Sequence, residues 1–153
     1  MCASRATQIR ISKEIKFIES ENYRVVIEED NVLLWHCTII GPSNTPYEKG
    51  EFECNITFPV DYPFSAPSIK FNTKLYHPNI SDTGEICLGI FKDWKAQYTI
   101  KQVLEGVLSL LIQPNSDDPL MPEIGNLYRT NKSRFLEIAK EWTKDYAKND
   151  KKD

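Results

Sequence analysis

Hydrophobic positions recur with helical spacing near both ends of the chain. An apolar stripe with charged residues between its members predicts a helix over residues 4–20. A second helix is predicted to begin at Thr99, which opens a capping box, and to stop at Pro114. Further helical patterns begin at Pro122 and run over residues 132–147. Helices are therefore expected at the start of the chain and throughout its last third.

Four runs between these helices predict strands, because they are rich in β-branched and aromatic residues and are separated by Gly, Pro, Asn and Asp. They are residues 23–30, 32–40, 51–58 and 68–72. In the third run Phe52, Cys54 and Ile56 alternate with polar residues and share one face. The element order predicts an α+β domain, an antiparallel meander covered by helices on one face and at one end.

The stretch from residue 71 to 97 shows no long regular pattern. Long irregular segments inside compact domains are uncommon and are usually functional or disordered. Apolar residues such as Tyr76, Ile80 and Trp94 argue against disorder here. We therefore expect an ordered segment that carries function.

Composition limits the class of protein. The chain has 153 residues, which suits one domain over 1–153, with a core of about 5–147 and a solvated tail over 148–153. Its net charge of −3 provides no global basic field for nucleic acid. No apolar run reaches membrane-spanning length and no hydrophobic leader is present, so we expect a soluble monomer of the cytoplasm or nucleus with no membrane partner.

The four cysteines fall into different environments. No C-x-x-C pair occurs, which argues against a zinc ribbon or a thioredoxin-like motif and predicts free thiols. Cys37 and Cys54 lie on the apolar sides of their strands and are predicted to be buried, whereas Cys2 is expected in an unstructured end. Cys87 follows a turn-like run and no pattern buries it, so a loop cysteine without a role and a reactive thiol both stay open.

A reactive Cys87 would suit one of two chemistries. A thiol hydrolase needs a histidine base and an orienting group, but His77 and Asn79 are only two positions apart, which disfavours that arrangement. An acyl carrier would accept an acyl group by thioester exchange and pass it to an amine. It needs a donor for the oxyanion, such as an asparagine amide, and a carboxylate near the amine. Asn79 and the acidic loop 115–120 could supply them.

Several motifs in order resemble the ubiquitin-conjugating enzymes. "HPNI" at 77–80 and "GEICL" at 84–88 follow "FPVDYPFSAP" at 58–67 and precede "PNSDDPLMPEI" at 114–124. The resemblance covers residues 5–146, close to a minimal catalytic domain without extensions. It implies an N-terminal helix, a four-stranded antiparallel meander, an active-site segment, a crossing helix and two C-terminal helices.

The resemblance also implies an activity. Cys87 would take ubiquitin as a thioester from the activating enzyme and deliver it to a substrate lysine or to a ligase cysteine. Asn79 would stabilise the oxyanion, shape the active-site loop, or do both, and Asp118 would prepare the attacking lysine. Five further residues would support the site: His77, Pro78, Leu88, Asn115 and Leu120. No metal or cofactor is implied, because the activating enzyme uses the ATP.

The partners implied by the resemblance are ubiquitin, its activating enzyme, RING or HECT ligases and protein substrates. The ligase surface of the family matches three segments of this chain. Its residues would be Arg10, Lys13, Pro63, Phe64, Lys95 and Ala96. Phe64 lies between prolines in a loop, where an exposed ring is a plausible interface anchor.

The chain departs from the family pattern at several positions. Lys95 and Ala96 stand where general-purpose members read Ser-Pro, and Gly89 replaces the aspartate or proline found beside the cysteine. Glu105 is expected on the exposed face of the crossing helix, where many members have an apolar residue. Two alternatives follow, a carrier of another ubiquitin-like modifier and a non-catalytic ubiquitin-binding module. Cys87 together with Asn79 and Asp118 argues against the second.

Overall fold

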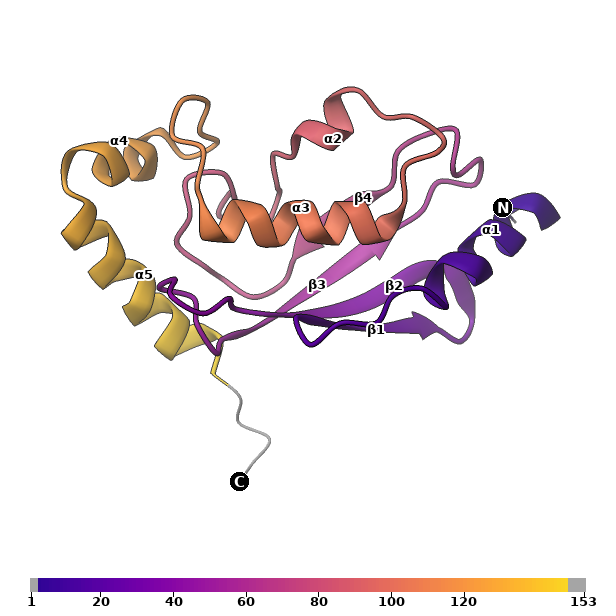
Figure 1. Ribbon diagram of the computed structural model, residues 1–153, viewed down its shortest axis with the longest axis horizontal. Helices are drawn as coiled ribbons and strands as arrows, with labels where there is room; N and C mark the ends of the chain where they lie inside the picture. The colour runs from indigo at the N-terminus through magenta and orange to yellow at the C-terminus, as the bar shows by residue number, and fades with distance from the viewer. Residues whose placement is uncertain (1–2, 149–153) are drawn as a thin grey trace.

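The computed structural model describes residues 3–148 and has the predicted α+β architecture, with one antiparallel sheet and five helices among those residues (Figure 1). The elements are α1 Arg5–Ile15, β1 Tyr23–Glu28, β2 Asn31–Ile40, β3 Glu51–Thr57, β4 Ser68–Phe71, α2 Gly89–Lys92, α3 Ile100–Ile112, α4 Pro122–Thr130 and α5 Lys132–Tyr146. The strand order β1-β2-β3-β4 is the predicted meander. Helix α1 lies at one end of the molecule, α3 crosses the sheet, and α4 and α5 lie at the other end (Figure 1).

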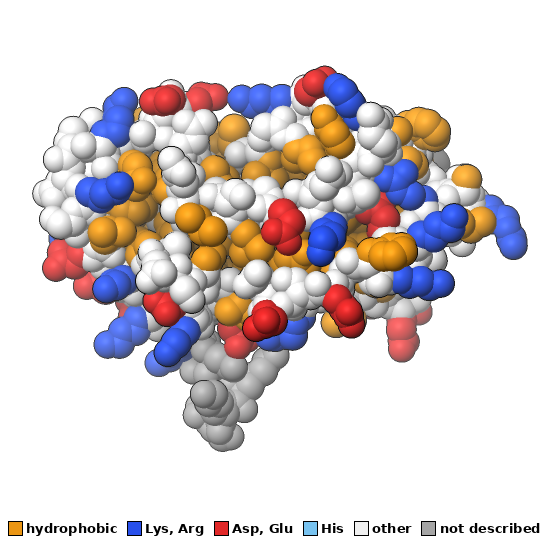
Figure 2. Space-filling model, viewed as in Figure 1, with side chains coloured by type: hydrophobic (Ala, Val, Ile, Leu, Met, Phe, Trp, Pro, Cys, Tyr) orange, Lys and Arg blue, Asp and Glu red, His pale blue; other side chains and the backbone are white. Residues whose placement is uncertain are grey.

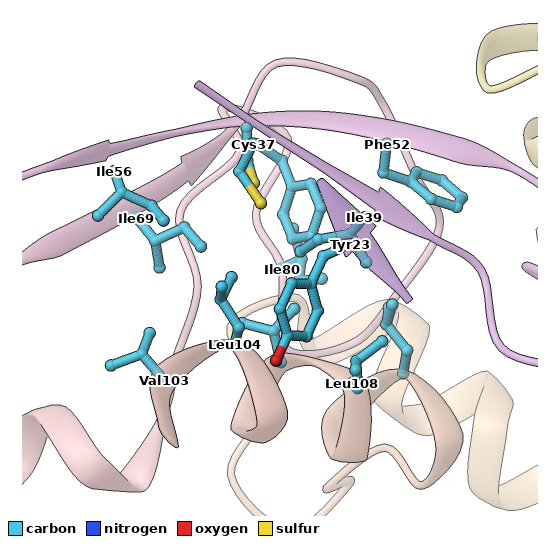
Figure 3. Close-up of a cluster of buried hydrophobic side chains, with 14 of the residues drawn as sticks. Tyr23, Cys37, Ile39, Phe52, Ile56, Ile69, Ile80, Val103, Leu104 and Leu108 are labelled. Carbon is cyan, nitrogen blue, oxygen red and sulfur yellow. The ribbon is translucent and has the colours of Figure 1, made fainter. Parts of the chain in front are cut away.

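The core forms between α3 and one face of the sheet. Cys37 of β2 and Cys54 of β3 lie opposite each other in the strand register, and both side chains are buried on the face that meets α3. Figure 3 shows apolar side chains of the sheet pointing toward Leu104 and Leu108 of that helix. The predicted burial of the two strand cysteines is confirmed. Because burial of apolar surface is the main favourable term in folding, this layer fixes α3 on the sheet.

Two predicted helix boundaries have different outcomes. The capping box at Thr99 is confirmed, with its hydroxyl accepting from the Gln102 N–H and the Gln102 side chain accepting from the Thr99 N–H. The first helix was predicted to extend to residue 20, but α1 ends at Ile15. Ile18 kept the helical spacing yet reaches the core from the turn that follows the helix.

The two ends of the chain limit what is described. Cys2 and residues 149–153 of the expected tail lie outside the described residues. Within residues 3–148, no helix is both long and apolar enough to cross a membrane.

The segment before Cys87 is ordered without long regular structure, as predicted. It contains isolated bridges between Lys70 and Glu85 and between Ile80 and Ile86. Gly84 adopts a φ of 90°, and its carbonyl accepts a hydrogen bond of 2.9 Å from the N–H of Phe71 at the end of β4. This left-handed conformation favours glycine, and the hydrogen bond attaches the segment before Cys87 to the edge of the sheet.

Substitution of Gly84 by alanine should lower the free energy of unfolding by about 2 kcal/mol or more. An added Cβ would lie 2.0 Å from the Phe71 carbonyl oxygen, and the positive φ adds strain. Gly89→Ala is the matched control, because a Cβ at Gly89 meets nothing within 4 Å. Urea unfolding of both variants checks the difference, and equal stabilities would contradict it.

Candidate functional site

An open groove of about 740 Å³ lies between the segment at Cys87, helix α3 and the loop that follows α3. The predicted residues that line it are Asn79, Cys87, Leu88, Asn115 and Asp118. Of the other predicted support residues, His77 and Pro78 are buried behind the groove, and Leu120 is 41% exposed but does not line it. The structure therefore brings the three proposed catalytic residues to one surface.

Cys87 differs from the other two described cysteines in its accessibility. Its thiol is free and the residue is half-buried, and its N–H donates to the Asn79 carbonyl at 3.1 Å. In contrast, a hydrogen bond with Cys37 and burial raise the pKa of the Cys54 thiol well above its ordinary value. The thiolate is the reactive form of cysteine, so the raised pKa and burial hold Cys54 inert, whereas Cys87 is the more accessible of the three described cysteines.

His77 is fully buried and links the segment to α3. Its Nε2 lies 2.8 Å from the Leu110 carbonyl, and its Nδ1 lies 2.9 Å from the Asn79 N–H. The carbonyl can only accept and the N–H can only donate, so the ring is neutral with its proton on Nε2. Burial lowers the pKa of His77 to about 4. This arrangement fits a structural histidine rather than a general base.

The Asn79 side chain joins two loops. Its Oδ1 accepts from the Asn115 N–H at 2.8 Å, and its Nδ2 donates to the Asn115 carbonyl at 2.8 Å. A second contact from Nδ2 to the Asp118 carbonyl is long, at 3.5 Å, and such contacts are weak. One N–H of the amide is therefore committed to the Asn115 carbonyl, and the other makes only this weak contact with the loop.

The loop after α3 presents Asp118 to solvent. Asp117 N–H donates to Asn115 Oδ1 at 3.1 Å within the loop, and Met121 N–H donates to the Pro78 carbonyl at 2.9 Å where the loop ends. The Asp118 side chain is 72% exposed and pairs with Lys92 Nζ at 3.4 Å. A carboxylate held in this way can receive a cationic group that enters the groove.

The residues predicted for ligase binding lie apart from the groove, on α1 and two loops. The Arg10 guanidinium donates to the Tyr98 carbonyl at 2.7 Å, and the Trp94 indole donates to the Pro63 carbonyl at 2.7 Å. These bonds bring α1 and both loops to one end of the molecule. Phe64 is 78% exposed, as expected from its loop position. Figure 2 shows Lys and Arg side chains gathered at the end that α1 forms.

The buried carboxylate of Glu14 was not predicted. It accepts hydrogen bonds from Arg10 Nε at 2.7 Å, from the Tyr62 hydroxyl and from the Ile100 N–H at 2.7 Å. It thereby joins α1, the Pro63 loop and the first turn of α3. A signal was present in the sequence, because Glu14 lies three residues after Ile11 on the apolar stripe, where an acid needs a partner.

Glu105 is exposed on α3, as predicted, but it is not free to move. Its carboxylate accepts a hydrogen bond of 2.9 Å from the hydroxyl of Tyr23. Burial and the hydrogen bond to Glu105 raise the pKa of Tyr23 to about 12, so the hydroxyl stays a donor at neutral pH. The charge is therefore fixed on the outer face of the helix.

The described residues hold no group of three or more His, Cys, Asp or Glu side chains that could bind a metal ion.

Comparisons with known proteins agree with this arrangement. The family model described as ubiquitin-conjugating enzyme matches residues 10–143. Among solved structures, the E2 domain of a ubiquitin conjugating enzyme from Toxoplasma gondii is similar at 38% sequence identity and a TM-score of 0.86. The similarity covers 92% of this chain and 99% of that chain.

Removal of the His77 imidazole should change how stability depends on pH. The folded pKa of about 4 lies below the unfolded value of about 6.5, so the unfolded state binds a proton first as pH falls. The contribution of the neutral His77 ring to the free energy of unfolding is fully present above pH 6.5 and is lost as the pH falls toward 4. The advantage of the wild type over His77→Gln should shrink by about 3 kcal/mol between pH 7 and pH 4. Urea unfolding across this range measures it, and parallel curves would contradict a neutral buried ring.

Proposed function

The chain belongs to the ubiquitin-conjugating enzyme family, and on that premise we propose that it carries ubiquitin as a thioester on Cys87. Ubiquitin arrives from the activating enzyme and leaves to a lysine of a protein substrate or to a ligase cysteine. The observation that carries this proposal is the accessible Cys87 thiol in one groove with Asn79 and Asp118, while Cys37 and Cys54 are buried.

The loading step is an exchange between thioesters. The Cys87 thiolate attacks the carbonyl carbon that joins ubiquitin to the activating enzyme, and the thiol of that enzyme leaves. The acyl group arrives already activated, so the groove needs no strong base beside the sulfur. The neutral, buried His77 is consistent with this requirement. ATP is consumed by the activating enzyme, and this chain needs no cofactor.

The transfer step requires an amine and an oxyanion donor. A substrate lysine enters beside Asp118, whose exposed carboxylate positions the ammonium and helps it lose a proton. The amine attacks the thioester, and the negative charge develops on the carbonyl oxygen. The N–H of Asn79 that makes only a long contact with the Asp118 carbonyl is the donor best suited to that oxygen, once it turns away from the loop. The Cys87 thiolate then leaves.

Ligases of RING or HECT type would contact the end of the molecule formed by α1 and the two loops. Lys13 is exposed there, and the exposed Phe64 ring supplies an apolar anchor. Lys95 and Ala96 contribute the second loop, with Lys95 Nζ paired to Asp93 at 2.9 Å. We propose that the chain acts as a monomer in the cytoplasm or nucleus.

Loading tests the proposal directly. The protein is mixed with ubiquitin, its activating enzyme and ATP, and the products are separated without reductant. We expect a band that thiol reductants remove in the wild type, a reductant-resistant ester in Cys87→Ser and no band in Cys87→Ala. Cys54→Ser serves as the matched cysteine control and should keep the band. Loading by a different modifier alone would contradict the identity of the cargo, and no loading by any modifier would contradict the carrier function.

Substitution of Asp118 should separate the two acceptors. In Asp118→Asn, discharge of the loaded protein to free lysine should slow by about tenfold or more, because the ammonium loses its carboxylate partner. Discharge to free cysteine should change by less than about twofold, since that acceptor reacts as a thiolate and is not a cation prepared by Asp118. Single-turnover discharge measures the ratio of the two rates, and an unchanged ratio would contradict the role of Asp118.

A further inference from the structure

Three lysines converge on a hollow at the end of the molecule opposite α1. The hollow has a volume of about 450 Å³ and lies between α5 and the loop of residues 41–50, which joins β2 to β3 (Figure 1). Lys49 lines it from the loop, and Lys140 and Lys144 line it from α5. The remaining lining residues are Thr45, Pro46, Glu48 and Thr143. The fold thus brings together cations from two elements that are far apart in the sequence.

Both walls of this lysine hollow are fixed by the backbone. The N–H of Glu51, just after the loop, donates to the Ala147 carbonyl at the C-cap of α5 at 2.7 Å. Gly50 lies so close to α5 that an added Cβ would be 2.8 Å from the methyl carbon of Thr143. Within the loop, the Gly50 N–H donates to the Tyr47 carbonyl at 2.9 Å. The lysines therefore extend from backbone positions that are held constant relative to each other.

The three ammonium groups are unpaired within the described part of the chain. Among the ion pairs of residues 3–148, none includes Lys49, Lys140 or Lys144. Glu48 also lines the lysine hollow, but its Oε1 accepts a long contact of 3.4 Å from the N–H of Asn44 in the same loop. The lysine hollow therefore carries three cations against one anion, on a chain whose net charge is −3.

The fold itself does not favour this gathering of like charges. Lys140 and Lys144 are four residues apart on α5, where like charges repel each other. Lys49 has a φ of 67°, a left-handed conformation that is uncommon for a lysine. A cation in the last turn of α5 interacts favourably with the helix dipole, which accounts for Lys144 but not for the other two. Backbone strain of this kind clusters at functional sites, so a binding role accounts for the arrangement.

We propose that the lysine hollow binds an acidic segment of a protein partner. The site is separate from the surfaces described above, because its lining residues are not those of the Cys87 groove and it lies at α5 rather than at the α1 end. The binding does not depend on the proposed carrier function.

The chemistry of the lysine hollow selects among anions. A lysine ammonium is a point charge, without the planar fork by which arginine holds a single phosphate. The hydroxyls of Thr45 and Thr143 already donate to backbone carbonyls, at 2.7 Å and 2.9 Å, so they supply no directed donor. Several separate cations suit several separate carboxylates, as a run of Asp and Glu supplies. A concave site does not fit the flat surface of a membrane, and nucleic acid requires a more extended basic surface.

The position of the lysine hollow has a use in conjugation. An acidic segment held at α5 leaves both the α1 end and the Cys87 groove open to other partners. A substrate tethered there would present its lysines to the groove at a raised effective concentration. This use, unlike the binding itself, rests on the proposed carrier function.

Titration of the isotope-labelled protein with a hexaglutamate peptide, followed by NMR, tests the binding. At an ionic strength of about 50 mM we expect amide shifts that saturate and centre on Lys49, Lys140 and Lys144. The apparent Kd should rise by about tenfold or more when the ionic strength is raised to about 300 mM, because salt screens exposed charges. A hexaglutamine peptide, which is neutral, should cause no shifts at these residues.

Two double variants localise the site. Lys140→Gln with Lys144→Gln removes two exposed cations of the lysine hollow and should raise the Kd for hexaglutamate by about tenfold or more. Lys16→Gln with Lys101→Gln makes the same change in net charge at exposed positions outside it and should leave the Kd within about twofold.

Three results would overturn the proposal. Equal weakening by the two double variants, or the absence of saturable shifts at the lysine hollow, would contradict the site. Shifts of the same size with inorganic phosphate would indicate a simple anion site and contradict the assignment to an acidic segment. Loading of Cys87 is measured separately, so the failure of this site and the failure of the carrier function are distinguishable.

Discussion

The buried turn formed by His77, Pro78 and Asn79 holds together the segments that surround the thiol. His77 bonds to the Leu110 carbonyl of α3, Pro78 accepts from the start of α4, and Asn79 bonds to the loop between them. The Asn79 carbonyl also accepts from the N–H of Cys87. Each buried polar group left unpaired would cost about 1–3 kcal/mol, so the turn, the loop and the thiol form one cooperative unit.

The polar groups of the groove divide into a neutral interior and a charged rim. His77 and Asn79 are buried and use their hydrogen bonds to fix positions. Asp118 and Lys92 stand in solvent, where their partners can be exchanged. This division suits the proposed carrier function, in which the acceptor changes from one reaction to the next, because the fixed part does not depend on which cation contacts the carboxylate.

Local patterns predicted the elements, but they did not predict how distant polar groups meet. The alternation of β3 correctly buried Cys54, and the capping box correctly placed the start of α3, since both depend only on neighbouring residues. The predicted end of α1 was wrong because Ile18 keeps the helical spacing but reaches the core from the turn after the helix. The order of the family motifs led to the prediction that Asn79 and Asp118 lie near Cys87. The pairing of Lys92 with Asp118, 26 residues apart, has no local signature.

Helix α3 is fixed at both ends by buried side chains from other parts of the chain. Glu14 accepts the N–H of Ile100 at its first turn, and His77 bonds to the Leu110 carbonyl near its last. Its 13 residues span about 20 Å at the rise of an α-helix. The spacing between the α1 end of the molecule and the groove that contains Cys87 is therefore set by a helix fixed at both ends. A partner bound at the α1 end would lie at a constant distance from this groove.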